Sequence, residues 1–332
     1  MSTRNDDRAE QVSWKVDDID VEATLTRPAG DGPFPAIAMV AGSGPTDRNW
    51  NSPLIPGTNG SAALLAQVLT AQNFITLRYD KRASGPDIRE NMLRLMGKIS
   101  MQGHREELAG GVRLLASRPD VDPKRLFALT SSEGCIHALN YQLHATDFPL
   151  AGLILTGAPA RSIGEVARGQ IGAQLAAVPG GDSMLAAYDA AMADFAAERP
   201  VTIDESLPEV LRMVIGAATA PHNLPFAREL WVTDPIQLAA SMTAPLLVII
   251  GKKDMQVDWQ VDGSRWEAFA KDHSNIIVVY PDNANHVLKH EPRPREQLSP
   301  AEIANSYSAE DTVLDPQVVE TITAWLSARR LS

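Results

Sequence analysis

The chain has 332 residues, of which 44% are hydrophobic and 21% are charged. This composition is typical of a globular protein and is long enough for one large domain with an insertion or for two domains. The formal charge is −11 and no run of Lys or Arg is present, which argues against nucleic acid or an anionic membrane surface as a partner.

The chain contains one cysteine, Cys135, so an intrachain disulfide is excluded. The first residues, 1–7, lack an apolar segment of the kind that directs export, and the longest apolar runs, such as 245–250, are far too short to span a membrane. We therefore expect a cytoplasmic protein without a membrane association. The oligomeric state is left open, with a homo-oligomer as one option.

Short apolar runs alternate with helical segments in the first half of the chain. A loosely alternating stretch at 12–27 predicts a β-hairpin, because residues 17–20 separate its two halves. The alternation that follows predicts βαβ units and a mostly parallel sheet with helices on both faces. In chain order we expect strand 36–40, helix 61–72, strand 74–79, helix 104–117, strand 125–129, helix 133–144 and strand 150–156.

The strand pattern is absent from residue 161 to residue 240. This segment is rich in Ala and Met and has helical periodicity in pieces, with Pro200 and Pro221 between them. Strand-like sequence then resumes at 245–250 and 275–280. We therefore expect a core made of residues 1–160 and 241–332, with residues 161–240 forming a helical cap over the sheet.

A final helix is predicted near the C-terminus. A polar loop over 289–313 is followed by Asp315, a favourable N-cap, and by Pro316, a favourable first helical residue. The helix is expected over 316–330.

The segment Thr130-Ser131-Ser132-Glu133-Gly134 has the layout of a nucleophile elbow. It joins a short apolar strand to an amphipathic helix, and a tight turn of this kind exposes a serine at the end of a sheet. The residues two before and two after the nucleophile must be small. Centring the motif on Ser132 places Thr130 and Gly134 at these crowded positions, whereas centring it on Ser131 would place Leu129 and Glu133 there. We therefore assign Ser132 as the nucleophile.

A serine needs a base within hydrogen-bonding reach and a group that orients the base. Asp254 follows the strand 245–250, and His286 lies in the loop after the strand 275–280. The chain order Ser, Asp, His is that of one known catalytic triad, and parallel strands present such residues at one edge of the sheet.

Other acidic and histidine side chains compete for these roles. Asp258 and Asp262 are expected in the helical segment that follows Asp254. His273 precedes its strand and so lies at the wrong edge of the sheet, and His290 sits beside Glu291 in the polar loop. The remaining histidines are expected to be packing or surface residues: His137, His144 and His222.

A glycine-rich turn, Ala41-Gly42-Ser43-Gly44-Pro45, follows the strand 36–40. Acyl transfer requires backbone N–H groups directed at the developing oxyanion, and glycine permits a close approach of the backbone. We assign the N–H groups of Ser43 and Glu133 as the two donors.

The same turn is a poor match to phosphate-binding loops. A dinucleotide fingerprint would need glycine where Asp47 stands, and no Gly-Lys-Ser/Thr follows. The sequence has no Cys-x-x-Cys or His-Glu-x-x-His motif, so we expect neither a metal nor another cofactor.

With these features, the chain resembles the α/β-hydrolases over nearly its full length. It resembles in particular the bacterial esterase and dienelactone-hydrolase-like branch, close to the acyl-peptidase group. The segments that carry the resemblance are 41–48, 78–85, the elbow, 251–254, 285–289 and the closing helix. The resemblance implies an eight-stranded sheet with a helical cap after the sixth strand, and the same roles for Ser132, Asp254, His286 and the oxyanion turn.

Two positions depart from the pattern of these relatives. They usually have His where this chain has Ala41 and Gly where it has Thr130. In such relatives Arg82 and the pair Asp47-Arg48 are structural more often than catalytic, so we leave them out of the catalytic set.

The predicted function is hydrolysis of a small-molecule carboxylic ester through an acyl-enzyme. Amide or peptide hydrolysis, acyl transfer and carbon–carbon bond hydrolysis use the same triad, so the fold does not choose among them. Dehalogenases and epoxide hydrolases are disfavoured, since they need a carboxylate at the elbow. A ligand-binding protein with little turnover is the alternative outside enzymes.

Overall fold

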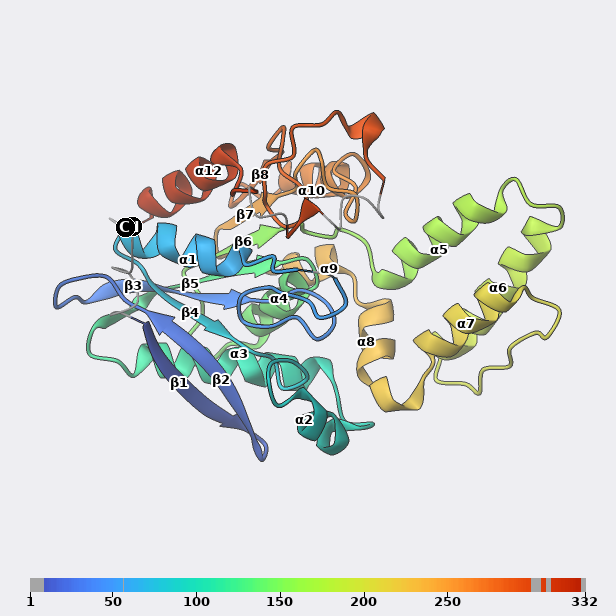
Figure 1. The fold of residues 1–332 in the computed structure, drawn as a ribbon, viewed down its shortest axis with the longest axis horizontal. Helices are drawn as coiled ribbons and strands as arrows, with labels where there is room; N and C mark the ends of the chain where they lie inside the picture. The colour runs from blue at the N-terminus through green and yellow to red at the C-terminus, as the bar shows by residue number, and fades with distance from the viewer. Residues whose placement is uncertain (1–8, 56, 300–305, 309–311, 330–332) are drawn as a thin grey trace.

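The computed structural model describes residues 9–55, 57–299, 306–308 and 312–329. Its centre is an eight-stranded sheet in the order β1-β2-β4-β3-β5-β6-β7-β8 (Figure 1). The strands are β1 (Ala9–Val16), β2 (Ile19–Thr26), β3 (Phe34–Val40), β4 (Ile75–Tyr79), β5 (Val121–Ser131), β6 (Gly152–Thr156), β7 (Leu246–Ile249) and β8 (Ile276–Val279).

The sheet is parallel except at one edge. Strands β1 and β2 form the predicted antiparallel hairpin, with Val16 opposite Ile19 across a two-residue turn. Strand β2 pairs antiparallel with β4, and every pair from β4 to β8 is parallel. The carboxyl ends of these parallel strands therefore meet at one edge, where loops from distant parts of the chain come together.

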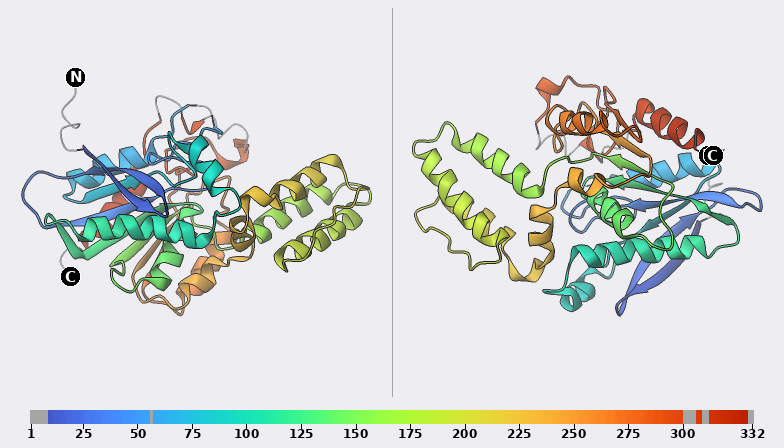
Figure 2. Two further views of the ribbon diagram at one scale, coloured as in Figure 1. Left: turned by 90° about the horizontal axis from the view of Figure 1, so that it is seen from below. Right: turned by 180° about the vertical axis from the view of Figure 1, so that it is seen from behind.

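Helices cover both faces of the sheet. Figures 1 and 2 show α1 and α12 on one face and α3 and α4 on the other. The helices in chain order are α1 (Ser61–Ala71), α2 (Ile88–Leu95), α3 (Met101–Ala116), α4 (Gly134–His144), α5 (Ile163–Leu175), α6 (Gly181–Ala196), α7 (Glu209–Ala218), α8 (Phe226–Val232), α9 (Pro235–Ala239), α10 (Val261–Ala270) and α12 (Pro316–Ser327).

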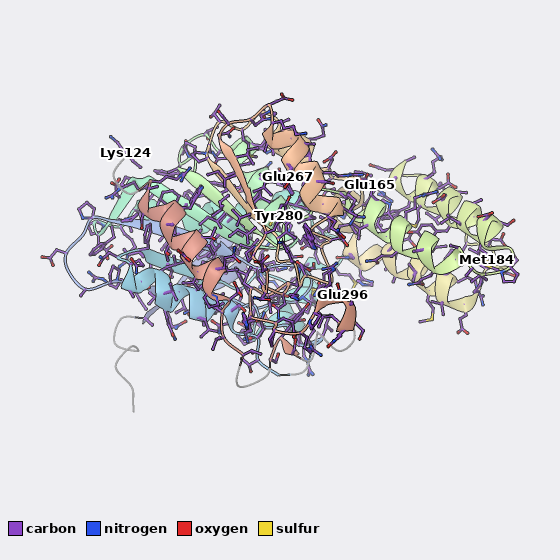
Figure 3. All side chains as sticks on the ribbon, turned by 90° about the horizontal axis from the view of Figure 1, so that it is seen from above. Lys124, Glu165, Met184, Glu267, Tyr280 and Glu296 are labelled. Carbon is purple, nitrogen blue, oxygen red and sulfur yellow. The ribbon has the colours of Figure 1, made fainter. Side chains whose placement is uncertain are left out.

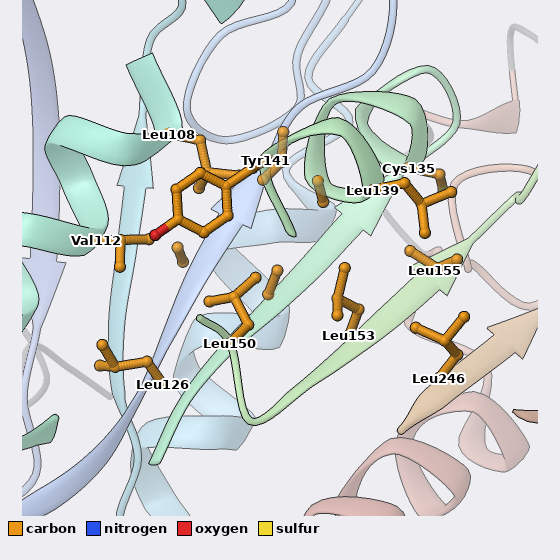
Figure 4. Packing of buried hydrophobic residues seen from close by; sticks show 14 of the residues in the cluster. Leu108, Val112, Leu126, Cys135, Leu139, Tyr141, Leu150, Leu153, Leu155 and Leu246 are labelled. Atoms are coloured by element: carbon orange, nitrogen blue, oxygen red, sulfur yellow. The ribbon is translucent and has the colours of Figure 1, made fainter. Parts of the chain in front are cut away.

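A separate hydrophobic core lies on each face. On one face, leucines of the strands pack against α3 and α4, and Figure 4 shows Leu126 of β5 and Leu153 of β6 in this core with Leu139 of α4. On the other, alternate residues of the same strands, such as Phe127, pack against α1 and the Trp325 ring of α12. Strands buried on both faces read as continuous apolar runs, which is why the short strands of this sheet were visible in the sequence.

Helices α5, α6 and α7 project away from the sheet (Figures 1 and 2). They share a hydrophobic cluster of their own, centred on Tyr188, Phe195 and Ile215. Figure 3 shows Met184 at the far end of this unit and Glu165 close to the core, where Glu165 pairs with Arg265 of α10 at 3.1 Å.

Helix α8 joins this projecting unit to the core. Phe226 and Leu230 of α8 pack with Ile99, Met101 and residues of α2 and α4. The following helix α9 belongs to the core, since Ala239 is part of the cluster on the α3 and α4 face. The helical segment between β6 and β7 thus includes one short helix that packs on the sheet domain.

The predicted elements correspond to observed ones, with small shifts of their ends, and no strand occurs between 161 and 240. Helix α2 was not predicted: half of its residues are polar, and its two buried positions are Asn91 and Leu95. Part of the loop 289–313 lies outside the described residues. The last helix was predicted over 316–330, but it ends at Ser327, with Ala328 as its C-cap. In the described part of the chain, every helix is too short or too polar to cross a lipid bilayer.

Candidate active site

Ser132 lies at a sharp turn between β5 and α4. Its backbone is in the left-handed region, with φ of 54°, and its N–H donates to the Thr156 carbonyl at 2.8 Å. Non-glycine residues rarely adopt this φ, and they keep it only where contacts with the surrounding structure hold the backbone there. Ser131 is instead the last residue of β5, so Ser132 occupies the apex.

The two crowded positions of the turn, Gly134 and Thr130, are accommodated for different reasons. A Cβ atom at Gly134 would lie 2.7 Å from the carbonyl oxygens of Val40 and Ala41, so a side chain is excluded there. The Thr130 side chain is fully buried, and its hydroxyl donates to the Ile154 carbonyl at 3.1 Å and lies 3.1 Å from the Cys135 sulfur. Thr130 therefore fits because its hydroxyl is satisfied inside the sheet.

Asp254 and His286 form a buried pair. The Nδ1 atom of His286 lies 2.8 Å from Oδ2 of Asp254, and Asp254 has no exposed surface. The second oxygen, Oδ1, accepts hydrogen bonds from the backbone N–H groups of Gln256 and Val257. With both carboxylate oxygens occupied, Asp254 holds the imidazole so that Nε2 is free to act as a base.

Ser132 and His286 line one cavity of about 150 Å³, together with Gly42 and Ser43. The His286 ring packs against the backbone of Gly157, where a Cβ atom would lie 3.0 Å from Cε1 of the ring. No hydrogen bond joins the Ser132 hydroxyl to His286 in the described part of the chain. Such bonds are often long without substrate and tighten only in the reacting complex, so the arrangement remains competent.

The turn after β3 lies against the nucleophile. A Cβ atom at Gly42 would lie 3.1 Å from the Ser131 carbonyl oxygen and 3.3 Å from the Ser132 Cβ atom, so glycine allows a closer approach than a side chain would without a shift of its neighbours. Within the residues that the structure describes, neither the backbone N–H of Ser43 nor that of Glu133 has a hydrogen-bond acceptor. Two unpaired N–H groups beside Ser132 are the arrangement that an oxyanion site requires.

The competing side chains have other partners. Asp262 lies in α10 and accepts from Arg161 at 2.7 Å, and Asp258 precedes α10 and pairs with Arg295. His290 pairs with Asp315 at 2.9 Å. The ring nitrogens of His273 and His144 bond to carbonyl groups one helical turn earlier, His222 is exposed, and His137 is buried beside Glu133.

The residues set aside as structural also have clear contacts. Arg48 forms a close ion pair with Asp80 at 2.6 Å, and Asp47 accepts from the backbone N–H groups of Asn49 and Asn51. Arg82 binds Glu107 at 2.9 Å behind the sheet edge. None of these side chains lines the cavity that holds Ser132.

A buried charged cluster behind the elbow was missed by the sequence analysis. Glu133 accepts from His137 at 3.1 Å and lies 3.9 Å from the ammonium of Lys81. Burial alone raises the pKa of the Glu133 carboxyl, but the His137 hydrogen bond and the Lys81 charge outweigh it and hold the pKa at about 2. Burial lowers the pKa of His137 to about 4. Charged residues directly after a buried strand, as in Tyr79-Asp80-Lys81, were the signal that could have revealed it.

A second cavity, of about 430 Å³, lies between the core and helix α8. Most of its walls are apolar, including Ile99, Phe226 and Leu230, and its polar end is formed by Lys81 and Glu133. It shares no lining residue with the cavity that holds Ser132. The elbow and the oxyanion turn separate the two.

This fold and this site together define a class of protein. A mostly parallel eight-stranded sheet, a serine on the turn between β5 and α4, and an Asp and a His after β7 and β8 are the arrangement of the α/β-hydrolases. The chain therefore has the fold of the α/β-hydrolases.

Comparison with known proteins agrees with this class. The chain is 26% identical over 291 residues to esterase EstD of Thermotoga maritima, a match that covers 85% of this chain and 62% of that protein. The chain thus spans less than two thirds of the length of this relative. No family model matches the chain.

Solved structures show the same fold. Est1E of Butyrivibrio proteoclasticus, which has also been solved with ferulic acid bound, superposes with a TM-score of 0.56 at 14% identity, covering 97% of this chain and 99% of that one. A thermophilic esterase of Thermogutta terrifontis has a TM-score of 0.54 at 18% identity, with coverage of 97% and 99%. A proline iminopeptidase of Mycobacterium smegmatis has a TM-score of 0.55 at 16% identity, again covering 97% and 99%.

Proposed function

We propose that the protein is a serine hydrolase that cleaves carboxylic esters through an acyl-enzyme. The observation that carries the proposal is a serine held at a strained apex in the same cavity as a histidine whose Nδ1 atom is bound by a buried carboxylate. The similarity to esterase EstD favours an ester as the substrate.

In the proposed mechanism the Ser132 hydroxyl attacks the ester carbonyl, and Nε2 of His286 accepts its proton. Asp254 orients the imidazole and stabilises the imidazolium that forms. The oxyanion of the tetrahedral intermediate is bound by the N–H groups of Ser43 and Glu133. The alcohol leaves with the proton from His286, and a water molecule then releases the acid by the same steps.

The cavity beside Ser132 supports a preference for short acyl groups. Its volume of about 150 Å³ is well below the roughly 300–1,000 Å³ that is usual for drug-sized ligands. We expect nitrophenyl acetate and butyrate to be cleaved with a higher kcat/KM than the decanoate, and the matching anilides much more slowly. Anilides cleaved as fast as the esters would favour amide hydrolysis instead.

A fluorophosphonate probe tests the nucleophile. The native protein should be labelled at Ser132, and Ser132→Ala should abolish labelling and lower kcat by at least about 10³-fold, because the attacking oxygen is lost. Ser131→Ala is the matched control, since its hydroxyl is one residue from the apex, and it should keep both labelling and turnover. A native protein that is neither labelled nor active would favour the ligand-binding alternative.

A further inference from the structure

The ammonium of Lys81 is buried directly behind the oxyanion turn. Lys81 follows β4 and is 3% exposed, and its Nζ donates to the Gly42 carbonyl at 2.5 Å. Burying a cation costs free energy unless the cation is hydrogen-bonded and paired. The polar contacts of this lysine, rather than apolar packing, therefore account for its buried position.

The acceptor of this hydrogen bond belongs to the same peptide group as a proposed oxyanion donor. The Gly42 carbonyl and the Ser43 N–H form one planar trans unit, in which the two groups point in opposite directions. Because Lys81 holds the carbonyl on one side, the N–H is turned to the other. Gly42 and Ser43 both line the cavity with Ser132, and the Lys81 side chain lines the cavity behind them.

Within the described residues, the neighbouring chain holds the next peptide rather than this one, because the Thr46 hydroxyl donates to the Ser43 carbonyl at 2.7 Å. Glycine at position 42 leaves the backbone free to rotate, and the preceding Ala41 has no polar side chain that could hold the turn. Within the described residues, Lys81 is the side chain that donates to the Gly42 carbonyl.

The same ammonium lies near the side chain of the residue that carries the second proposed donor. It lies 3.9 Å from the Glu133 carboxylate, which is held in turn by His137, and the backbone N–H of Glu133 is the other proposed donor. One buried positive charge thus contacts both segments of the oxyanion site. A fixed charge behind a peptide dipole strengthens the N–H as a donor, and in a water-excluded site this effect is large.

We propose that Lys81 is a positioning residue that fixes and polarises the Gly42–Ser43 peptide for oxyanion binding. The inference rests on the proposed hydrolytic function. Lys81 does not touch the substrate, so its loss should weaken binding of the tetrahedral anion while leaving binding of the neutral ester largely intact.

The test compares turnover with binding of an oxyanion mimic. In Lys81→Met we expect kcat for nitrophenyl acetate to fall about 10- to 100-fold with KM within about threefold, and the affinity for an alkyl boronic acid, which forms a tetrahedral anion on serine, to fall in parallel with kcat. An unchanged kcat, or a loss that appears in KM alone, would overturn the proposal.

A chemical rescue keeps the test independent of how well Lys81→Met folds. Lys81→Cys can be alkylated with 2-bromoethylamine, which restores an ammonium on a side chain of the native length, or with 1-bromopropane, which gives a neutral side chain of the same length. The apolar cavity of about 430 Å³ that Lys81 lines provides access. The native cysteine, Cys135, is buried and its pKa is raised by burial to about 12, so it reacts slowly.

The aminoethyl form should regain at least tenfold in kcat over the propyl form. Equal activity of the two forms would contradict the proposal. Arg161→Met is the control for loss of a partly buried cation elsewhere, since Arg161 pairs with Asp262 and lines neither cavity, and it should keep kcat.

The proposed function and this inference fail in different ways. If Ser132→Ala keeps activity, the assignment of Ser132 as the nucleophile is wrong, and the proposed role of Lys81 at its oxyanion site is wrong as well. If Ser132 is labelled and essential but Lys81→Met behaves as the native protein does, only the role of Lys81 is wrong.

Discussion

At the scale of single residues, the candidate site depends on residues that hydrogen bonds hold in place. Asp254 has three hydrogen-bond donors around its carboxylate, two from the backbone and one from His286. Ser132 is held at φ of 54° by its own hydrogen bond to Thr156. Rigid support of this kind keeps reacting groups within the few tenths of an ångström that catalysis needs.

Replacing Asp254 with Asn should remove activity while leaving the fold intact. An asparagine oxygen can still accept from Gln256 and Val257, but its NH₂ group would then face Nδ1 of His286 and force the proton onto Nε2. The imidazole could no longer accept the serine proton, and we expect kcat to fall about 10⁴-fold. Circular dichroism should be unchanged. An activity loss of less than tenfold would contradict the assigned role.

At the scale of elements, the site is assembled by turns at the ends of parallel strands. The turn after β3 carries Ser43, the turn after β5 carries Ser132, and the loops after β7 and β8 carry Asp254 and His286. Because β3, β5, β6, β7 and β8 are successive neighbours in the sheet, residues more than 240 positions apart meet at one edge.

The helical unit α5 to α7 has a stabilising core that is separate from both faces of the sheet. Phe195 is 1% exposed at its centre, where it packs edge-on against Trp231 with ring centroids 6.1 Å apart and lies under the Arg228 guanidinium. Such a unit can loosen without unfolding the sheet.

Phe195→Ala should therefore destabilise this unit locally. Removing a buried phenylalanine costs about 3–5 kcal/mol, and here the cost falls on helices that do not share the main cores. Hydrogen exchange should show faster exchange of amides in α5 to α7 and unchanged protection in β3, β5 and β6. Val210→Ala, at an exposed position of α7, is the control. Uniform loss of protection over the whole chain would show that the unit is not independent.

At the scale of the whole molecule, a buried network of charged and polar groups joins the elbow to α3. Glu133 and His137 lie beside His104, whose ring is 4.4 Å from that of His137 and which pairs with Glu107. Although burial raises the pKa of the Glu107 carboxyl, its contacts with His104 and Arg82 outweigh that effect and hold the pKa at about 2. A fall in pH therefore changes the protonation of these buried groups and with it the stability of the fold.

The folded protein should lose stability as the pH falls from about 6.5. The folded-state pKa of His137 is about 4, so between these values the unfolded chain takes up a proton there that the folded chain does not, which favours unfolding. Below about pH 4.5 the carboxyls of Glu133 and Glu107 add to the loss, because their pKa values are lowered to about 2 in the folded state.

We expect Tm to fall by about 3–10 °C between pH 7 and pH 4, measured by scanning calorimetry. His137→Gln removes the histidine whose pKa burial lowers to about 4 and should flatten the curve between pH 6.5 and 4.5. His222→Gln, at an exposed position, should leave the curve unchanged. The same slope in the His137 variant and the native protein would show that His137 does not control acid stability.

The amino-acid sequence by itself determined the local features of this protein. Alternating apolar runs located the strands, the Asp315-Pro316 pair located the start of α12, and side-chain size at Gly134 assigned Ser132 to the apex. The strands, the helix start and the apex of the turn depend mainly on residues that are close together in the chain, so they can be predicted from the sequence.

The tertiary structure decided among distant groups that the sequence left in competition, and it formed contacts of which the sequence carries no sign. It paired His286 with Asp254 and left Asp258, Asp262 and His290 with other partners, and it brought Lys81 to the Gly42 carbonyl. The physical reason is that burial and contact across a sheet edge depend on strand order and register, so a lysine 39 positions from its acceptor along the chain gives no local sign of the bond it makes.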